Sequence, residues 1–423
     1  MKSWGNIYST YESKFIKIQD LKNLSFSNID KPLLAYGLGR SYGDSCLISQ
    51  GSYIDLTKCK KVIDFDSSKG IIECESGISL EELANIIMPE WFIPVSPGTK
   101  FVTLGGAIAN DVHGKNHHKC GTFGAHVISL ELLRSNGEKL TCSMNENVNM
   151  FKATIGGLGL TGLVTKAKIK LIKAGSFYIQ QKKIKFQSLD EYFSISNTLD
   201  KVNDYSVAWV DCINGKNIKG IYMTGNFLID NQKNKKINLK ISVPFYFPYK
   251  LLNRYTIKIF NFFYYHLSRQ GLSNVYYDKF FYPLDSIHNW NRIYSKKGFY
   301  QLQFVINQSN KNDLNNIFAE IKKSGMGSFL AVLKTFGDLS SPGMLSFPKK
   351  GYTLALDFPN HGEKTVSFIK KIEEMVISIG GRIYPAKDIL MSKENFHKSY
   401  DLSQFSHFRD KSFNSDFSKR MKI

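Results

Sequence analysis

Cysteines and acidic residues are both scarce in this chain of 423 residues. The six cysteines include no Cys-x-x-Cys pair and none follows Cys212, which argues against a disulfide scaffold or a cysteine-rich zinc site and favours a reducing compartment. Asp and Glu number 36 against 56 Lys and Arg, so the net charge is +20. This excess of positive charge indicates an anionic partner, which could be a nucleic acid, a phosphorylated ligand or an anionic membrane surface.

Several other signals are missing. The first 19 residues contain no apolar h-region, so no secretory signal is expected. The most apolar long window, 241–267, contains three cations and two early prolines, and therefore does not predict a membrane-spanning helix. No zinc-finger or RNA-recognition signature supports nucleic-acid binding. No Gly-x-Ser-x-Gly elbow supports serine-hydrolase chemistry.

The window 241–267 nevertheless has an unusual composition. It mixes Phe and Tyr with cations and directly follows a basic run at 232–240. Aromatic rings at the depth of lipid headgroups and cations on lipid phosphates are typical of a peripheral membrane surface. An aromatic helix packed on the core behind a solvated basic loop is the compatible alternative. We expect a cytoplasmic protein that associates through 232–267 with the inner face of the membrane.

The texture of the chain changes near residue 175. Before it, glycines and short β-like runs dominate, at 32–35, 51–56, 70–75 and 163–171, with one short helix expected at 80–87. In 163–171, Ala167, Ile169 and Leu171 alternate with lysines, as in a half-buried strand. After it, helix-like windows at 311–323 and 364–378 lie between strand-like runs at 300–307 and 352–358. The second part is therefore predicted to be a separate α+β domain.

Three glycine-rich segments carry the chemistry of the first part: 35–44, 96–114 and 155–162. Glycine permits positive φ and lets backbone N–H groups approach a ligand closely. Each segment alone is compatible with structural turns, but three in one domain of a basic protein favour a cofactor that carries a pyrophosphate. One of them matches Gly-x-Gly-x-x-Gly at 157–162, yet it leads into a strand, and residues 180–183 are Gln and Lys. A nicotinamide site of the Rossmann type, which needs a helix and a later acidic residue, is therefore not predicted.

The histidines at 113, 117 and 118 suggest a metal site at first sight. Gly114 disfavours the helix that would align them, and the Glu of a His-Glu-x-x-His motif is absent. We therefore expect no metal, and we expect His113 and Lys115 to face a cofactor ring or a phosphate instead.

Four segments in this order, GLGRSYGD, SPGTKFVTLGGAIANDVHGKNHH, GTFGAHVISLELL and IGGLGLTGLV, resemble the FAD-binding domain of the vanillyl-alcohol-oxidase-type flavoproteins. The similarity continues through FYPLD, QLQFVI, FLAVLKTFG, LSFPKKGYTLALDFP and GRIYPAKD, so it covers nearly the whole chain. HGKNHH with the later YPAKD is similar to the branch that contains the oxidase subunit of decaprenylphosphoryl-β-D-ribose 2′-epimerase. The resemblance implies an α+β fold of two domains: an FAD domain at 1–175, a substrate domain with an antiparallel sheet at 176–381, and a segment at 382–423 that returns to the FAD domain.

The cofactor that the resemblance implies is FAD, held without a covalent bond. Relatives with covalent flavin carry a histidine where this chain has Arg40, which cannot form that bond. The implied FAD-binding residues are Ala35, Tyr36, Gly37, Leu38, Gly39, Arg40, Ser41, Tyr42, Gly43, Asp44, Ser45, Gly98, Thr103, Leu104, Gly105, Gly106, Asn110, Asp111, Val112 and His113, with Val164 on the adenine side and Tyr384 near the isoalloxazine. Tyr42, His113, Lys115, Gln303, Lys334 and Lys387 would surround the sugar.

The reaction that the resemblance implies is oxidation of the 2′-hydroxyl of a polyprenylphosphoryl pentose, such as decaprenylphosphoryl ribose, to the 2′-keto sugar. A short-chain keto-reductase would be the partner that completes the epimerisation. Lys387, with Asp388 beside it to orient or neutralise it, would stabilise charge on the flavin or act as the base, and His113 is a competing base. The alternative within the same fold is a soluble sugar-lactone or alditol oxidase, which would not need the aromatic and basic stretch.

The chain departs from the family pattern at the rim of the substrate pocket. The tyrosine of the family's FYHPLD-like motif falls on Phe281, with Tyr282 next to it, and the Asn-x-Cys pair falls on Thr353 and Ala355. The rim of the pocket therefore differs, so the resemblance does not establish that the sugar or the lipid chain is identical, and a cysteine-directed covalent inhibitor would find no thiol at Ala355.

Overall fold

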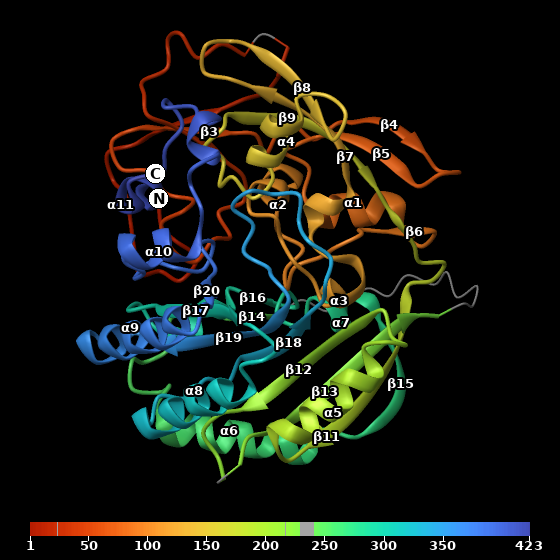
Figure 1. The fold of residues 1–423 in the computed structure, drawn as a ribbon, viewed down its shortest axis with the longest axis vertical. Helices are drawn as coiled ribbons and strands as arrows, with labels where there is room; N and C mark the ends of the chain where they lie inside the picture. Colours follow the sequence, from red (N-terminus) through yellow and green to blue (C-terminus); the bar gives the residue numbers. More distant parts are fainter. Residues whose placement is uncertain (23, 216, 229–240) are drawn as a thin grey trace.

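The computed structural model describes residues 1–22, 24–215, 217–228 and 241–423, and its elements fall into an upper and a lower part (Figure 1). The upper part contains two sheets of three or more strands. The three-stranded parallel sheet has the order β1 (Lys14–Lys17), β3 (Ser52–Asp55), β2 (Leu33–Tyr36). The five-stranded antiparallel sheet has the order β4 (Val62–Asp66), β5 (Ile71–Glu75), β9 (Leu163–Lys170), β7 (Val127–Leu133), β8 (Lys139–Ser143).

Strand β9 confirms the alternation seen in the sequence. Ala167 and Ile169 are buried in the hydrophobic core, while Lys166 and Lys168 on the other face form ion pairs with Glu73 of β5 at 3.1 and 3.3 Å. Short helices pack on the face of the five-stranded sheet that carries Ala167 and Ile169. They are α1 (Leu80–Ile87), α2 (Leu104–Ala109), α3 (His117–Cys120), the 3₁₀ turn η1 (Phe123–His126) and α4 (Val148–Thr154), while β6 (Trp91–Phe92) pairs with β10 (Ile172–Lys173).

The lower part is built on an eight-stranded antiparallel sheet. Its order is β15 (Gly271–Tyr276), β11 (Tyr178–Phe186), β13 (Lys219–Phe227), β12 (Tyr205–Asp211), β18 (Ala331–Phe336), β19 (Gly351–Pro359), β17 (Phe299–Ile306), β20 (Arg382–Ile383). The even-numbered side chains of β12, β13, β17 and β19, among them Tyr222, Leu302 and Leu354, enter one hydrophobic core with three helices, together with Ala331 and Leu333 of β18. These helices are α5 (Leu189–Leu199), α8 (Lys311–Ser324) and α9 (Glu363–Ser378). The α+β prediction with an antiparallel sheet in the second part is therefore confirmed.

The alternate side chains of the same strands, even-numbered in β18 and odd-numbered in the others, point to the opposite face, which meets the upper part of the molecule. At one end of this face α6 (Arg254–Leu267) packs Tyr265 against Trp209 and Ile221. The remaining elements of this region are β14 (Ile241–Ser242), α7 (Tyr277–Phe281), β16 (Ile287–His288) and the 3₁₀ turn η2 (Trp290–Tyr294). The period of two in each strand thus separates the core from the face that is free to hold a ligand.

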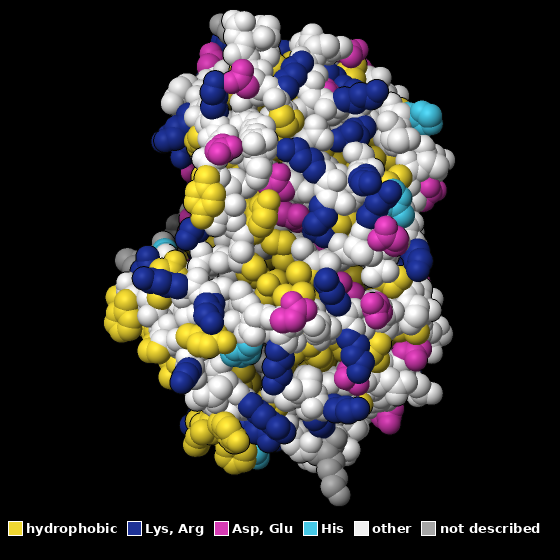
Figure 2. Space-filling view, turned by 90° about the vertical axis from the view of Figure 1, so that its left-hand side faces the viewer, with side chains coloured by type: hydrophobic (Ala, Val, Ile, Leu, Met, Phe, Trp, Pro, Cys, Tyr) yellow, Lys and Arg dark blue, Asp and Glu magenta, His cyan; other side chains and the backbone are white. Residues whose placement is uncertain are grey.

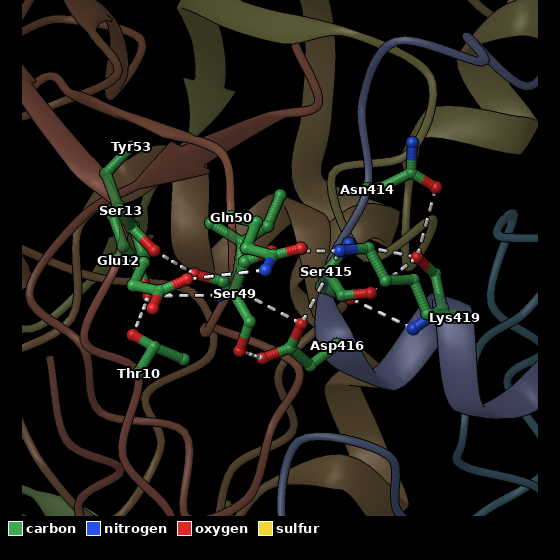
Figure 3. A network of polar contacts seen from close by, with 12 residues as sticks. Thr10, Glu12, Ser13, Ser49, Gln50, Tyr53, Asn414, Ser415, Asp416 and Lys419 are labelled. Carbon is green, nitrogen blue, oxygen red and sulfur yellow. Dashed lines mark hydrogen bonds and ion pairs between the residues drawn. The ribbon is translucent and has the colours of Figure 1, made fainter. Parts of the chain in front are cut away.

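The last residues of the chain return to its first ones. Helices α10 (Lys393–Ser399) and α11 (Asp416–Met421), with the 3₁₀ turn η3 (Phe405–His407) between them, lie in the upper part, where both termini are close together (Figure 1). Asp416 accepts hydrogen bonds from the backbone N–H and the hydroxyl of Ser49 at 2.9 Å, and Lys419 donates to the Ser49 carbonyl (Figure 3). Arg420 bridges two carboxylates, Asp44 at 2.8 Å and Asp388 at 2.9 Å. The domain boundaries at 175 and 381 remain predictions, since no independent observation tests them.

Candidate active site

A cavity of about 920 Å³ lies where the upper part meets the opposing face of the eight-stranded sheet. Its lining combines the loop that follows β2, the segments 96–115 and 158–164, and side chains of β11, β12, β17, β18 and β19. Figure 2 shows the corresponding hollow at mid-height, with hydrophobic side chains at its base. This volume is at the upper end of the range for ligand pockets, about 300–1,000 Å³, so it suits a large cofactor together with part of a substrate.

The wall on the upper side consists of glycine-rich backbone. Strand β2 ends at Tyr36 and continues directly into Gly37, where a Cβ would lie 2.4 Å from the Thr103 side-chain oxygen. Gly39 has a φ of +58°, a conformation that favours glycine. Thr103 in turn caps α2 by accepting a hydrogen bond from the N–H of Gly106. A close-packed glycine wall of this kind lets a ligand approach the backbone itself.

Three buried polar atoms on this wall have no hydrogen-bond partner among the residues that the structure describes: Arg40 Nε, Ser45 Oγ and Ser76 Oγ. The Arg40 guanidinium lies over the ring of Trp4, 4.1 Å from its centroid, and burial lowers the pKa of this arginine. A buried polar atom without a partner costs about 1–3 kcal/mol, so a polar ligand that pairs with all three would stabilise the wall. The phosphate and ribityl oxygens of FAD have the chemistry that these donors need.

Most of the predicted cofactor residues line the cavity, including Tyr384 and Val164. Four do not, and each has another role in the structure. A Cβ on Gly43 would lie 1.7 Å from the Asp388 carbonyl oxygen, and the Asp44 carboxylate pairs with Arg420. Leu104 is buried in the core, and Asp111 is fully buried and accepts hydrogen bonds from the hydroxyls of Ser341 and Ser346. These four residues pack behind the glycine-rich wall and stabilise it without lining the cavity.

The opposite wall is a row of polar side chains on three adjacent strands. In the strand register, Gln303 of β17 lies opposite Ala355 of β19, and Gln301 lies opposite Asp357. Lys334 of β18 lies opposite Thr353. With the exception of Thr353, which accepts a hydrogen bond from Gln303, these side chains line the cavity. The structure therefore brings together Gln303 and Lys334, as predicted, and adds Gln301 and Asp357.

His113 links the two walls. Its Nδ1 lies 3.1 Å from Lys334 Nζ and its Nε2 lies 2.9 Å from Gln303 Nε2, while its ring packs on Phe336 and Tyr384. Burial and the charge of Lys334 hold the pKa of His113 well below its usual range. The imidazole is therefore neutral, with one N–H and one lone pair, so it accepts a hydrogen bond from one of these two groups and donates its N–H toward the other. Its lone pair is already engaged, which makes it a poor base for a substrate hydroxyl.

Lys387 enters the cavity from a turn that joins both walls. The N–H of Tyr384 donates to the Gln303 carbonyl at 2.9 Å, and the N–H of Tyr42 donates to the Ala386 carbonyl at 3.0 Å. Lys387 Nζ lies 3.8 Å from the centroid of the Tyr42 ring. Burial lowers the pKa of Lys387, whereas the nearby Asp357 carboxylate acts in the opposite direction.

The carboxylate that faces Lys387 is not the one expected from the sequence. The Asp388 side chain accepts from the N–H groups of Leu390 and Met391 and pairs with Arg420, so the interpretation that it neutralises Lys387 is wrong. Asp357 is the carboxylate whose charge acts on Lys387: burial raises the pKa of Asp357, and its carboxylate accepts a hydrogen bond from Gln301.

The other predicted residues of the site are also placed by the structure. Lys115 lines the cavity but donates to the carbonyls of Phe280 and Phe281 at 2.6 and 2.9 Å, and burial lowers its pKa to about 7. At the rim, Phe281 lines the cavity, whereas the Tyr282 hydroxyl is bonded to Ser96.

The three clustered histidines point to different partners, since His117 stacks on Phe336 and His118 contacts the Asn203 carbonyl. No group of three His, Cys, Asp or Glu side chains suited to a metal occurs among the described residues.

Comparison with known proteins agrees with this geometry. Residues 25–143 match the FAD binding domain family. Decaprenylphosphoryl-β-D-ribose oxidase of Mycolicibacterium smegmatis is 34% identical over 414 residues, which cover 92% of this chain and 89% of the relative. D-arabinono-1,4-lactone oxidase of Yarrowia lipolytica is 23% identical over 198 residues, 44% of this chain and 37% of the relative. Cytokinin dehydrogenase 3 of Arabidopsis thaliana is 27% identical over 162 residues, 36% and 30% of the two chains.

Fold, cavity and matches together define an FAD-dependent oxidoreductase of the vanillyl-alcohol-oxidase type, which confirms the predicted class and cofactor. Within this class the chain belongs to the family that includes decaprenylphosphoryl-β-D-ribose oxidase.

Proposed function

We propose that the protein oxidises the 2′-hydroxyl of a polyprenylphosphoryl pentose to the 2′-keto sugar, and that a separate short-chain keto-reductase completes a 2′-epimerisation. The similarity to the M. smegmatis oxidase, whose name gives its substrate as decaprenylphosphoryl ribose, extends over both parts of the chain. FAD, when bound, supplies the acceptor for the hydride. The remaining tasks, which are to orient the alcohol, exclude water and balance charge, belong to the protein.

One observation carries the proposal: the glycine-rich wall and the polar row of the sheet face each other across a single cavity, with Lys387 between them. The unpartnered Arg40, Ser45 and Ser76 atoms are suited to the cofactor, and Gln303 and Lys334 are suited to a sugar. An alcohol held between the two walls is brought next to both sets of groups, which converts an encounter in solution into an oriented contact.

Lys387 is the group that we assign to charge stabilisation. In its protonated form it places a positive charge at the junction of the walls, where the low polarity of the buried cavity strengthens its effect on any negative charge that develops. Asp357 favours this protonated form. His113 is assigned a positioning role, because both of its ring nitrogens are occupied by Lys334 and Gln303.

A soluble sugar-lactone oxidase is the second candidate, supported by the similarity to D-arabinono-1,4-lactone oxidase over 44% of the chain. The far end of the cavity favours the lipid-linked substrate. It is lined there by Trp209, Phe260, Tyr264 and Phe329, which offer aromatic surface to a long apolar chain.

The test is anaerobic reduction of the FAD-loaded protein by a candidate substrate. The loss of flavin absorbance measures the reduction. A polyprenylphosphoryl ribose with a short, water-soluble prenyl chain is compared with arabinono-1,4-lactone at equal concentration. We expect rapid bleaching by the former and slow bleaching or none by the latter. Faster reduction by the lactone would refute the proposal and establish the second candidate.

A further inference from the structure

Helix α6 is apolar on two opposite faces. Its inner side chains Ile257 and Tyr265 are 3% and 7% exposed and pack on the sheet. The outer stripe consists of Tyr255, Ile259, Phe262, Phe263 and Leu267, which we call the α6 surface; their exposed fractions are 75%, 57%, 49%, 53% and 75%. A helix on the surface of a soluble domain normally turns a polar face to water. Five large apolar side chains on one stripe therefore indicate that something covers them.

The segment that carries the α6 surface contains charges of one sign only. From Ile241 to Tyr277 the chain contains no Asp or Glu, while Lys250, Arg254 and Arg269 are exposed on or beside the helix. More apolar side chains are exposed at both ends of the helix, where Phe245 and Leu272 are 64% and 68% exposed. Figure 2 shows hydrophobic and basic side chains side by side along the left-hand edge of the lower part. Aromatic rings flanked by cations match the headgroup region of an anionic bilayer, whereas a protein partner would more commonly require charges of both signs.

The α6 surface is continuous with the cavity. Phe260 and Tyr264, on the flank of the same helix, are 46% and 37% exposed and also line the cavity. Their rings contact Phe329 and Trp209, with centroid distances of 5.6 and 4.7 Å, and both of these residues are cavity residues. One helix thus forms both an outward apolar stripe and an edge of the cavity that we assign to substrate.

We propose that α6 lies flat on an anionic lipid bilayer through the α6 surface, so that the lipid chain of the substrate passes from the membrane across Phe260 and Tyr264 into the cavity. This inference rests on the proposed function for the identity of the chain that enters. None of the described helices has the length and hydropathy to cross a membrane, so the contact would be peripheral. The basic run 232–240, expected to take part in it, lies outside the described residues.

The experiment uses the FAD-loaded full-length protein and vesicles of phosphatidylcholine with or without 50% phosphatidylglycerol, at about 0.15 M salt, where charge attraction extends only about 8 Å. The α6 variant carries Ile259→Gln, Phe263→Gln and Leu267→Gln, none of which lines the cavity. The matched control replaces Tyr11, Ile63 and Val202 by Gln, because these side chains are 86%, 49% and 69% exposed elsewhere on the molecule. We expect the wild type and the control to sediment with the anionic vesicles, and the α6 variant to bind at least tenfold more weakly.

A second readout separates this inference from the proposed function. Flavin reduction by the water-soluble short-chain substrate should be the same in all three proteins, and reduction by a long-chain substrate embedded in vesicles should be slow only in the α6 variant. If the short-chain substrate fails to reduce the wild type, the proposed function is wrong, whatever the vesicles show. If the short-chain substrate reduces the wild type but the α6 variant binds vesicles as well as the control does, the membrane contact is wrong. Conversion of a wild-type dimer into a monomer by the α6 substitutions, with vesicle binding unchanged, would likewise overturn it and identify an interface between two copies.

Discussion

Replacement of Lys387 by alanine tests the charge-stabilising role directly. The side chain projects from a turn whose backbone is fixed by Tyr384 and Ala386, so its truncation should leave the walls of the cavity intact. The atoms assigned to FAD binding, on Arg40, Ser45 and Ser76, lie on the glycine-rich wall. We therefore expect the variant to bind FAD and to lose mainly the reductive half-reaction. Loss of one preorganised electrostatic contact typically costs about 10²–10³ in rate, or roughly 2.7–4 kcal/mol.

The assay is stopped-flow reduction of the bound flavin at saturating substrate. Truncation of Lys387 also leaves Asp357 without its cation, and a buried unpaired carboxylate would complicate the result. The double variant Lys387→Met with Asp357→Asn removes both charges and should be as slow as the single variant. Lys387→Arg keeps the charge but not the compact ammonium, and should recover little. A wild-type reduction rate in Lys387→Ala would refute this reasoning and return His113 to consideration as the catalytic residue.

Four further outcomes are expected. The protonated form of Lys387 is lost as pH rises through its pKa, so the flavin-reduction rate should fall on the alkaline side, and Asp357→Asn, which removes an attraction that raises this pKa, should move that fall to lower pH. Lys334→Ala should raise the apparent KM more than it lowers the flavin-reduction rate, because it removes a buried cation from the sugar end of the cavity. FAD should be released by acid denaturation and washing, because Arg40 cannot bond to it covalently; a fluorescent protein band on a denaturing gel would contradict this. Arg420→Met should lower the free energy of unfolding by about 3 kcal/mol, measured by denaturant titration, because it leaves Asp44 and Asp388 buried without their cation.

Local periodicity predicted much of the secondary structure. The helix expected at 80–87 is α1, which begins with a capping box between Ser79 and Glu82, and the windows at 311–323 and 364–378 correspond to α8 and α9. The strand-like runs at 300–307 and 352–358 correspond to β17 and β19. Such elements are predictable because each buries a face whose spacing is visible in the sequence itself. The order of the eight strands was not predicted, because pairing between segments that are far apart in the chain leaves no local pattern.

Helix α6 shows why a local pattern can leave two interpretations open. Its sequence mixes aromatic residues and cations without a polar stripe, which suits both a packed helix and a membrane surface. The structure shows that Ile257 and Tyr265 are packed while Ile259 and Phe263 are exposed, so the packed interpretation describes one face and leaves the other without a partner in the described residues. The two interpretations therefore apply to different sides of the same helix.

The site illustrates the same limit at the level of single residues. Lys334 and Gln303 were placed through the resemblance to a family, whereas Asp357 was not, although it lies in a quoted motif of the same resemblance. A signal for Asp357 existed: in β19 it is two residues from Ala355 and four from Thr353, so strand alternation places it on the cavity face. An acidic residue in an otherwise apolar strand is costly to bury, and it is retained where a cation compensates it. The cation whose charge acts on Asp357 is Lys387, from a turn 30 positions later in the chain. Only the three-dimensional fold identifies the pair, and the pair is what gives the polar row its expected dependence on pH.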